Sequence, residues 1–594
     1  MFSSGNYPSA WGEGIITPVL KGGSVDDCKY YRGITLTNII AKVYSQLLLN
    51  RLTKWSITHD KLIDNQYGFQ KGKSTTDCIF ILHSLIYKSF KDRKKLYVAF
   101  LDWEKMFDRI DRCFLWQKLI SENVSSKVTI AIKSMYCSIK SCIRYKGIKS
   151  DFINSKIGVK QGDPSSSLLC LFFLNDIIQH INTDIDGIMT LEELKLFLLF
   201  FADDAVLFAQ NPRSLQSMLS DVETYCNTWG MKLNVNKTKC MIFELGRSTS
   251  YNFYIYNTLI ELVDSFKYLG VHLFKNNRWN RTQKRIASHA ASSLHNLFIT
   301  FNQLDLKTSQ KVKLFDSLIS PILNYTSCVW GYCSSKEIET IHTKFCRKVL
   351  YVKKSTNLNA MYGELGRVPM FIQRKIQMIK YWAKILSKPE TTILYKTYTM
   401  LKNKVNIGCT DSNNWAYQIK LILDRSGFSN IWLLQHTSPY LINLIKTRIL
   451  DNYYQSWYAN INNTSKLETY CLIKHTFGFE EYLDFIKDKK IRISLTQFRV
   501  SSHDLNIEVG RYTNITRNQR ICTNCSMNIL ECEYHFLLVC PKYRDLRIKF
   551  FPPYYCHWPT YNKFESLLCQ NSKLVKEKIA KYIYHAHKLR NLTN

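Results

Sequence analysis

Residues 194–209, which read LKLFLLFFADDAVLFA, constrain the fold of this chain more than any other stretch. Two short apolar runs flank the adjacent acids Asp203 and Asp204. Runs of this length, rich in Phe, Leu and Val, predict a buried β-hairpin whose tip carries both carboxylates. Carboxylates against apolar surface are costly unless a cation neutralises them, and hard oxygen ligands suit Mg²⁺. The alternative is a β-turn in which the two aspartates serve only the turn geometry.

The charge of the chain indicates the class of its partner. Of 594 residues, 81 are basic and 47 are acidic, which gives a formal net charge of +34. Such an excess favours an acidic polymer as partner, and nucleic acid is the first candidate. No apolar run approaches the roughly 18 residues of a membrane-spanning helix, and no signal peptide is visible, so we expect no membrane partner.

A second strand is predicted to end in an acid. Residues 96–101 form an apolar run that stops at Asp102. An acid at the C-terminal end of a buried strand is well placed to share a metal ion with the acids of the hairpin. Two further acids, Asp108 and Asp111, precede a helical pattern that starts near Arg112. We interpret both as helix N-caps.

Several predicted loops carry residues suited to ligand contact. Lys21 and Arg32 lie on either side of a predicted hairpin turn and could reach one phosphate-bearing ligand, although each alone reads as a solvated surface charge. Residues 66–75, QYGFQKGKST, combine basic and aromatic side chains that suit nucleic-acid contacts, with an ordinary surface loop as the alternative. In residues 157–167, IGVKQGDPSSS, glycine lets the backbone approach a ligand closely, although a plain loop-to-helix junction fits equally.

A cluster of possible metal ligands occurs near the C-terminus. Cys522, Cys525, His535 and Cys540 have the spacing C-x2-C-x9-H-x4-C. Three thiolates and one imidazole at these intervals suit one tetrahedral structural Zn²⁺. Cys532 could replace one ligand, and unmetallated buried cysteines are the alternative. The remaining cysteines are scattered, which predicts reduced thiols in a cytosolic or nuclear protein.

Taken together, seven segments resemble the reverse transcriptase of non-LTR (LINE-type) retrotransposons, and they occur in the order of that family. A zinc-knuckle pattern like the one above also ends many proteins of this type. The seven segments are residues 31–36 (YRGITL), 66–69 (QYGF), 102–108 (DWEKMFD), 158–162 (GVKQG), 201–204 (FADD), 233–238 (LNVNKT) and 268–270 (YLG).

The resemblance implies an α+β fold of the right-hand polymerase type. We expect fingers, a palm with an antiparallel sheet and a helical thumb, followed by a mostly helical C-terminal region with a small zinc knuckle. The expected domains are fingers and palm at 1–275, a helical thumb or connection at 276–400, a helical region at 401–515, a CCHC zinc knuckle at 516–545 and a tail at 546–594.

The activity that the resemblance implies is RNA-directed DNA polymerisation, in which a DNA 3′-hydroxyl is extended on an RNA template with deoxynucleoside triphosphates. Two Mg²⁺ ions are expected in such a site. By resemblance, Asp102 and Asp203 are their ligands, and Asp204 supports the site. Lys21 and Arg32 correspond to the pair that binds the triphosphate.

Other residues take roles by the same resemblance. Phe107 matches the bulky residue beneath the sugar, which excludes a ribose 2′-hydroxyl. Gln161 and Gly162 would line the pocket of template and incoming base. Lys237 matches a loop lysine proposed to protonate pyrophosphate, with an ordinary surface lysine as the alternative. The expected partners are the RNA template, a DNA primer or target, and the nucleotides. The expected location is the nucleus and cytoplasm.

The sequence also departs from the pattern of the family. Met106 stands where alanine is common, Asp163 where cysteine is common and Ser167 where proline is common, and we expect the charge of Asp163 to weaken nucleotide binding. The chain starts late relative to the family, which predicts an N-terminally truncated copy whose activity could be impaired. Two alternatives stay open: a catalytically decayed or domesticated retroelement fragment that binds nucleic acid, and a group II intron maturase-like protein.

Overall fold

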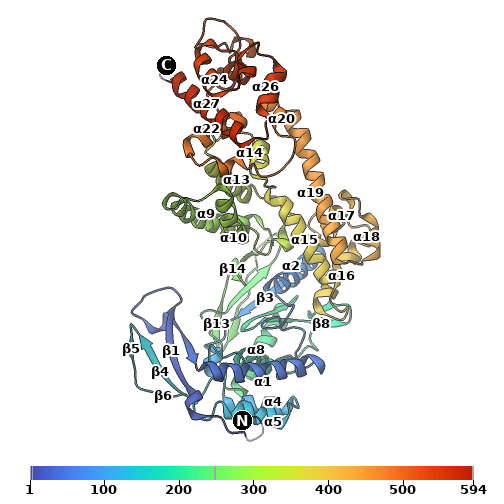
Figure 1. Ribbon diagram of the computed structural model, residues 1–594. Helices are drawn as coiled ribbons and strands as arrows, with labels where there is room; N and C mark the ends of the chain where they lie inside the picture. The colour runs from blue at the N-terminus through green and yellow to red at the C-terminus, as the bar shows by residue number, and fades with distance from the viewer. Residues whose placement is uncertain (1, 3–4, 247–248, 592–594) are drawn as a thin grey trace. The chain divides into compact units, whose positions relative to one another are not determined.

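The computed structural model describes residues 2, 5–246 and 249–591, and it divides into two compact units (Figure 1). The first unit runs to Arg278 and also includes Lys388–Tyr417. The second unit comprises Trp279–Ser387 and the residues from Gln418 onward. Strands occur in the first unit, whereas the second unit is built from helices. The expected α+β architecture with a helical C-terminal region is therefore confirmed.

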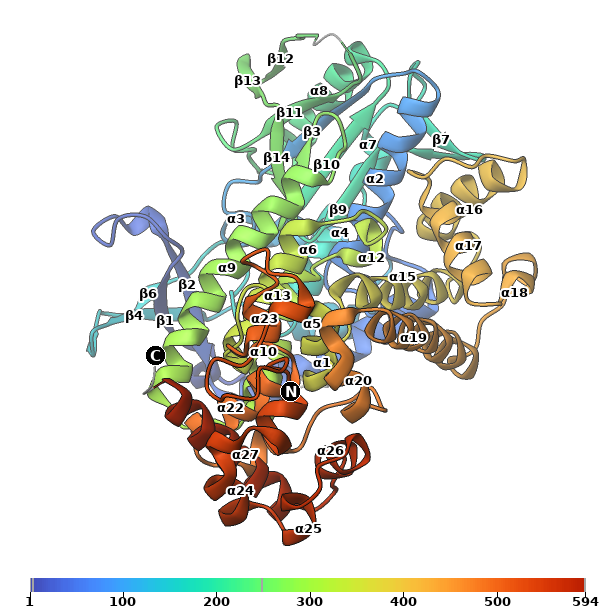
Figure 2. The ribbon, with the colours of Figure 1, turned by 90° about the horizontal axis from the view of Figure 1, so that it is seen from above.

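The main sheet of the first unit has six strands in the order β12-β13-β11-β3-β10-β9 (Figure 2). Strands β10 and β11 both pair antiparallel with β3, one on each side. The predicted hairpin is confirmed, because β9 pairs with β10 and the chain reverses at residues 202–203. The strand bounds are β3 Leu96–Leu101, β9 Leu198–Phe201, β10 Asp204–Ala209, β11 Lys239–Phe243, β12 Phe253–Ile255 and β13 Thr258–Leu262.

The central strands are apolar along nearly their whole length because protein covers both faces of the sheet. Ala99 and Leu207, for example, are fully buried within one large core that also contains residues of α6 and α8. Helix α8 packs against β3 and β10, and α2 packs against β9. This burial fixes the register of the sheet, because a slip by one residue would turn every side chain to the opposite face.

A second sheet of five strands lies in the N-terminal part of the first unit. Strand β1 pairs antiparallel with β2, as the sequence predicted for the first hairpin, and parallel with β4. Two small hairpins, β7–β8 and β14–β15, complete the strands. The bounds are β1 Glu13–Leu20, β2 Tyr31–Thr37, β4 Lys140–Tyr145, β5 Ile148–Lys149, β6 Ile153–Asn154, β7 Met189–Leu191, β8 Leu194–Leu196, β14 Ser265–Tyr268 and β15 Val271–Phe274.

The helices of the first unit include one that is distant in sequence. Helix α16 lies within 388–417, packs against α2 and β7, and donates the Ile393 amide to Asp64 at 2.6 Å. The bounds are α1 Ile39–Thr58, α2 Thr75–Lys91, α3 Met106–Arg109, α4 Arg112–Ser121, α5 Ser126–Ser134, α6 Ser166–Leu174, α7 Ile177–His180, α8 Pro212–Thr228 and α16 Ile393–Asn406. Helix α17, Trp415–Arg425, crosses the division between the units.

The second unit encloses buried charge as well as apolar side chains. Arg499 donates to Glu364 at 2.9 Å, and the Tyr482 hydroxyl donates to the same carboxylate. No helix in the described part of the chain is long and apolar enough to cross a membrane. The bounds are α9 Asn280–Gln303, α10 Thr308–Leu318, α11 Ser320–Leu323, α12 Ser327–Trp330, α13 Lys336–Leu350, α14 Leu358–Leu365, α15 Met370–Leu386, α18 Ser429–Leu434, α19 Pro439–Asn462, α20 Glu468–Ile473, α21 Tyr482–Phe485, α22 Lys489–Arg499, α23 Asn506–Val509, α24 Arg544–Phe550, α25 Pro553–Cys556, α26 Tyr561–Leu568 and α27 Lys573–Asn591.

Candidate active site and candidate metal centre

The register of three strands places a row of charged residues at one end of the main sheet. Ala205 of β10 lies opposite Leu101 of β3, so Asp204 comes level with Asp102. On the other side, Lys239 of β11 lies opposite Phe100, which brings Lys237 level with Asp102. The Lys237 Nζ atom is 3.8 Å from Asp102 Oδ2. The structure therefore brings together residues that are more than a hundred positions apart.

Mutual repulsion and burial make this group of acids electrostatically costly. Burial raises the pKa of Asp102, and nearby Asp203 raises it further, while Lys237 and Lys21 oppose both effects. Asp204 still reaches solvent, yet partial burial, followed by Asp203 and Asp102, raises its pKa to about 6. Asp203 therefore acts on both other carboxylates, which places the three acids in one electrostatic group.

The second sheet contributes basic side chains to the same site. Arg32 lies opposite Val19 in the β1–β2 pair, and Lys21 follows β1 directly, with its amide donating to the Tyr30 carbonyl at 2.8 Å. The pKa of Lys21 is lowered by burial, then by Arg32 and Lys237, whereas Asp102 and Asp108 raise it. Lys21 is thus in electrostatic contact with the acids of the main sheet.

The loop of residues 157–165 is hydrogen-bonded both to the second sheet and to α3. The Gln161 carbonyl accepts a hydrogen bond from the Thr35 amide at 2.8 Å, and the Phe107 carbonyl accepts one from the Val159 amide at 2.8 Å. Gly162 has φ +111°, and a Cβ there would lie 2.7 Å from the Thr35 carbonyl oxygen. Only glycine fits this approach, so the close contact explains the glycine at this position.

Asp108 has a different role from the one predicted. The N-cap of α4 is Asp111, whose side chain accepts from the Cys113 and Phe114 amides, and this part of the expectation is confirmed. Asp108 lies within α3 and accepts the Gln161 side-chain amide at 2.9 Å, so its assignment as an N-cap is wrong. A capping residue directly precedes its helix, as Asp111 does, so adjacency to the helical pattern is the sequence signal that distinguishes the two acids.

Asp163 turns into the protein interior. Its Oδ1 atom accepts hydrogen bonds from the Ser45 hydroxyl at 2.5 Å, the Ser165 hydroxyl at 2.7 Å and the Ser165 amide at 2.9 Å. The side chain is 8% exposed and connects α1 to the start of α6. Because the Asp163 carboxylate is bonded to these serines in the interior, the structure does not support the expected weakening of nucleotide binding.

Another polar residue, Gln66, was assigned only to a loop by the sequence. Its side chain is buried and reaches the tip of the β9–β10 hairpin, where it hydrogen-bonds Ala202. Gln66 lies in the segment between α1 and α2, where no hydrophobic periodicity indicates which side chains are buried. Its partner follows only from the tertiary structure.

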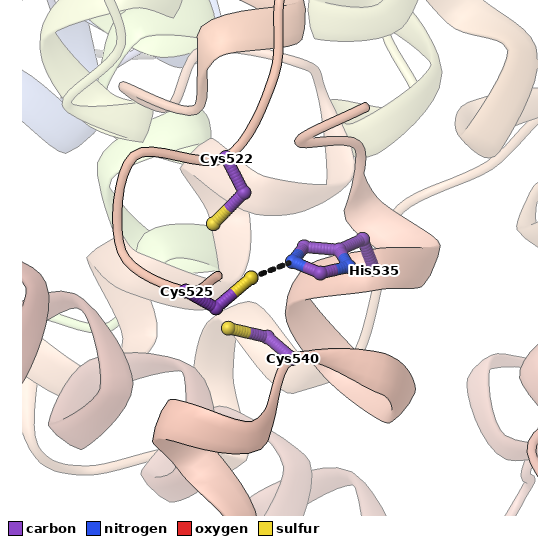
Figure 3. A group of neighbouring side chains, drawn as sticks. All are labelled: Cys522, Cys525, His535 and Cys540. Atoms are coloured by element: carbon purple, nitrogen blue, oxygen red, sulfur yellow. Dashed lines mark hydrogen bonds between the residues drawn. The ribbon is translucent and has the colours of Figure 1, made fainter. Parts of the chain in front are cut away.

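The cysteine and histidine residues near the C-terminus converge as predicted. Figure 3 shows the thiols of Cys522, Cys525 and Cys540 and the imidazole of His535 directed at a common space. Their ligand atoms all lie within 4.8 Å of one another, and Cys532 is not part of the group. The Cys522 amide donates to the Ile529 carbonyl at 2.9 Å, which closes a loop that contains Cys525.

A buried acid beside Cys522 joins two of the helices around the cluster. Glu531 accepts two hydrogen bonds from Arg590 of α27, at 3.0 and 2.9 Å, and one from the Asn506 amide of α23 at 2.8 Å. Burial is the main reason that the pKa of Cys522 is raised to about 12 and that of Cys540 to about 11. Deprotonated thiols are therefore costly here without a cation.

The main sheet, in which β9, β10, β3 and β11 pair antiparallel, carries acids at the end of β3 and at a hairpin tip. This arrangement fits the palm of the right-hand polymerase fold that the sequence predicted. Residues 19–273 match the family described as reverse transcriptase (RNA-dependent DNA polymerase). Residues 19–273 are therefore similar in sequence to the reverse transcriptase family.

Known relatives include polymerases of non-LTR retrotransposons. The probable RNA-directed DNA polymerase from transposon BS of Drosophila melanogaster is 24% identical over 391 residues, which cover 61% of this chain and 42% of the relative. The RNA-directed DNA polymerase from mobile element jockey, from the same organism, is 21% identical over 345 residues, covering 57% and 37%. The chain thus spans less than half the length of these relatives.

Among solved structures, a telomerase from Candida tropicalis in complex with a TWJ fragment of telomeric RNA has a TM-score of 0.34 and 14% identity, covering 70% of this chain and 65% of the other. A TM-score this low carries no argument about the fold, which is defined by its own sheets.

Proposed function

We propose that this chain is an RNA-directed DNA polymerase of a non-LTR retrotransposon, which extends a DNA 3′-hydroxyl on an RNA template with deoxynucleoside triphosphates. The convergence of Asp102, Asp203 and Asp204 opposite Lys21 carries the proposal. The names of the relatives support the reaction, and the net charge of +34 supports nucleic acid as partner.

The acid site fits divalent metal ions. Carboxylate oxygens are the donors that Mg²⁺ prefers. The pKa values of Asp102 and Asp204 are raised mainly by burial and further by neighbouring carboxylates, so a bound cation would offset the cost of their charged forms. Asp102 and Asp203 would hold two Mg²⁺ ions. When bound, such ions favour the deprotonated 3′-hydroxyl and stabilise the leaving pyrophosphate.

The protein side chains bind and orient the nucleotide. Lys21 and Arg32 would neutralise the triphosphate, whose charge increases as the bond to the leaving group breaks. Lys237, beside Asp102, would deliver a proton to the departing pyrophosphate. Gln161 and Gly162 would line the base pocket.

Phe107 is the proposed sugar gate. It belongs to α3, and its carbonyl is tied to the 157–165 loop through the Val159 amide. A bulky ring at this position would clash with a ribose 2′-hydroxyl and select deoxynucleotides.

Primer extension on an RNA template tests the proposed reaction. Wild-type protein should give a magnesium-dependent product, and Asp203→Ala should abolish it. The matched control is Asp184→Ala, which removes an exposed acid paired with Lys195. A folded wild type that binds RNA but gives no product would favour the decayed fragment, and promotion of intron self-splicing would favour a maturase-like protein.

We further propose one structural Zn²⁺ on Cys522, Cys525, His535 and Cys540. The donor set fits, because three sulfurs and one imidazole nitrogen complete a tetrahedral site with no open position. Metal analysis should find one zinc per chain, lost in Cys525→Ser and retained in the matched variant Cys532→Ser. Equal zinc content in both variants would contradict this assignment.

We also propose residence in both the cytoplasm, where the chain is made, and the nucleus, where a chromosomal target lies. Microscopy of the tagged full chain would test this location, and exclusion from the nucleus would contradict it.

A further inference from the structure

The hairpin turn that carries Asp203 is held from outside the sheet by one buried side chain. Gln66, which is 3% exposed, accepts the Ala202 amide on Oε1 at 2.9 Å. Its Nε2 atom donates to the Ala202 carbonyl at 3.3 Å. One side-chain amide therefore contacts both polar backbone groups of a single turn residue.

Ala202 needs such support because its backbone is strained. Its φ of +60° lies in the left-handed region, which costs an alanine about 1 kcal/mol or more. Strand pairing between β9 and β10 ends at Phe201 and Asp204, so the ladder does not extend to Ala202. A primary amide carries one carbonyl acceptor and N–H donors, and it can replace the missing backbone partner.

The segment around Gln66 is itself fixed against the hairpin. The Tyr67 amide donates to the Phe200 carbonyl, and the Phe200 amide donates to the Asn65 carbonyl, both at 2.8 Å. The Gln66 Oε1 atom also accepts the Gly68 amide at 2.8 Å. A Cβ on Gly68 would lie 2.1 Å from the Ala202 nitrogen, so only glycine permits this contact. Gln66 therefore lies in a segment, residues 65–68, that packs closely against the β9–β10 hairpin and supports its turn.

We propose that Gln66 is a positioning residue: it fixes the Ala202 turn and thereby the placement of the Asp203 carboxylate relative to Asp102. The inference rests on the proposed polymerase function for its consequence in catalysis. Lys21, Arg32 and the 157–165 loop lie on other elements, so nucleotide binding should not depend on Gln66. Loss of the amide should impair metal binding and the chemical step.

The test compares Gln66→Leu, which removes both hydrogen bonds, with Gln66→Glu, which keeps the acceptor of the Ala202 amide but loses the donor. Gln216→Leu is the matched control, because the Gln216 side chain of α8 likewise contacts both backbone groups of one residue, Tyr254 of β12, at 3.0 and 2.9 Å. Three quantities are measured: amide hydrogen exchange of the 198–206 peptide, Mn²⁺ binding by electron paramagnetic resonance, and steady-state primer extension.

We expect Gln66→Leu to accelerate exchange at the turn, weaken Mn²⁺ binding and lower kcat by about 100-fold, the scale of a 1 Å misplacement. The nucleotide KM should stay within about twofold, since ground-state binding is retained. Gln66→Glu should lie between Gln66→Leu and wild type, and Gln216→Leu should resemble wild type in Mn²⁺ binding and kcat. Adding Ala202→Gly to Gln66→Leu should restore part of kcat, because glycine adopts positive φ without strain.

Unchanged Mn²⁺ affinity and kcat in folded Gln66→Leu would overturn the proposal, as would a loss confined to nucleotide KM. If Gln66→Leu does not fold, Gln66→Glu decides the question in the same way: weaker Mn²⁺ binding supports the positioning role and unchanged binding refutes it. An inactive wild type would contradict the proposed function alone. Exchange and Mn²⁺ binding would still test the support of the turn, with Asp203→Ala as the reference for lost metal binding.

Discussion

Asp163→Asn should destabilise the first unit and leave nucleotide affinity unchanged. The carboxylate accepts three hydrogen bonds from Ser45 and Ser165, at 2.5 to 2.9 Å, in the protein interior. A hydrogen bond to a charged group contributes about 1.5–3 kcal/mol, and a neutral one about 0.5–1.5 kcal/mol. Replacing charge by an amide of the same shape should therefore cost about 1 kcal/mol per bond, or up to about 3 kcal/mol in total.

Urea unfolding followed by tryptophan fluorescence would measure this loss, and steady-state primer extension would measure the nucleotide KM. A double-mutant cycle with Ser45→Ala separates the Ser45–Asp163 bond from the rest, and a coupling of about 1 kcal/mol is expected for a direct contact. Asp184→Asn, at an exposed acid, is the control and should leave the urea midpoint in place. An unchanged midpoint together with a lower nucleotide KM in Asp163→Asn would refute this reasoning, because it would mean that the carboxylate acts on the nucleotide.

Three further predictions follow from other parts of the chain. Burial lowers the pKa of His83 to about 4 from 6.5, so stability should fall as the pH drops through this window, by up to about 3 kcal/mol, and His83→Gln should remove this dependence in pH-resolved urea titrations. Glu364→Gln should destabilise the second unit by about 1.5–3 kcal/mol in urea unfolding, because the buried Arg499 guanidinium loses one charged acceptor and keeps only Glu480, at 3.2 Å; a loss under about 0.5 kcal/mol would contradict this. Phe107→Ala should raise ribonucleotide incorporation at least tenfold relative to deoxynucleotides, and equal discrimination would argue against the sugar gate.

The sequence predicted those features that depend on local pattern. The apolar runs around Asp203 predicted the hairpin, and the spacing of Cys522, Cys525, His535 and Cys540 predicted a cluster that the structure brings together. In both cases neighbouring residues suffice, because a short turn or loop determines where the next ligand lies. The orientation of a side chain in a loop follows no such rule, and Asp163 is the example.

Tertiary packing determined the remaining features. Residues 388–417 have the helical pattern of their neighbours, yet they pack with the first unit, where the Ile393 amide meets Asp64. The contact spans 329 positions, and no periodicity within either segment encodes it. The contacts of Gln66 and Asp108 could not be predicted for the same reason, since the partner of each lies on another element.

The row formed by Asp204, Asp102 and Lys237 shows how the register of a buried sheet produces a reactive site. Each residue flanks a strand whose apolar side chains fix its pairing, so the core of the sheet sets the alignment of charges at its end. The charges themselves oppose this arrangement, as the raised pKa of Asp204 indicates, and the positive φ of Ala202 adds backbone strain at the same tip. Both costs are small compared with the apolar burial of β3, β9 and β10. The fold can therefore hold acids close together at the point where polymerase chemistry would use them.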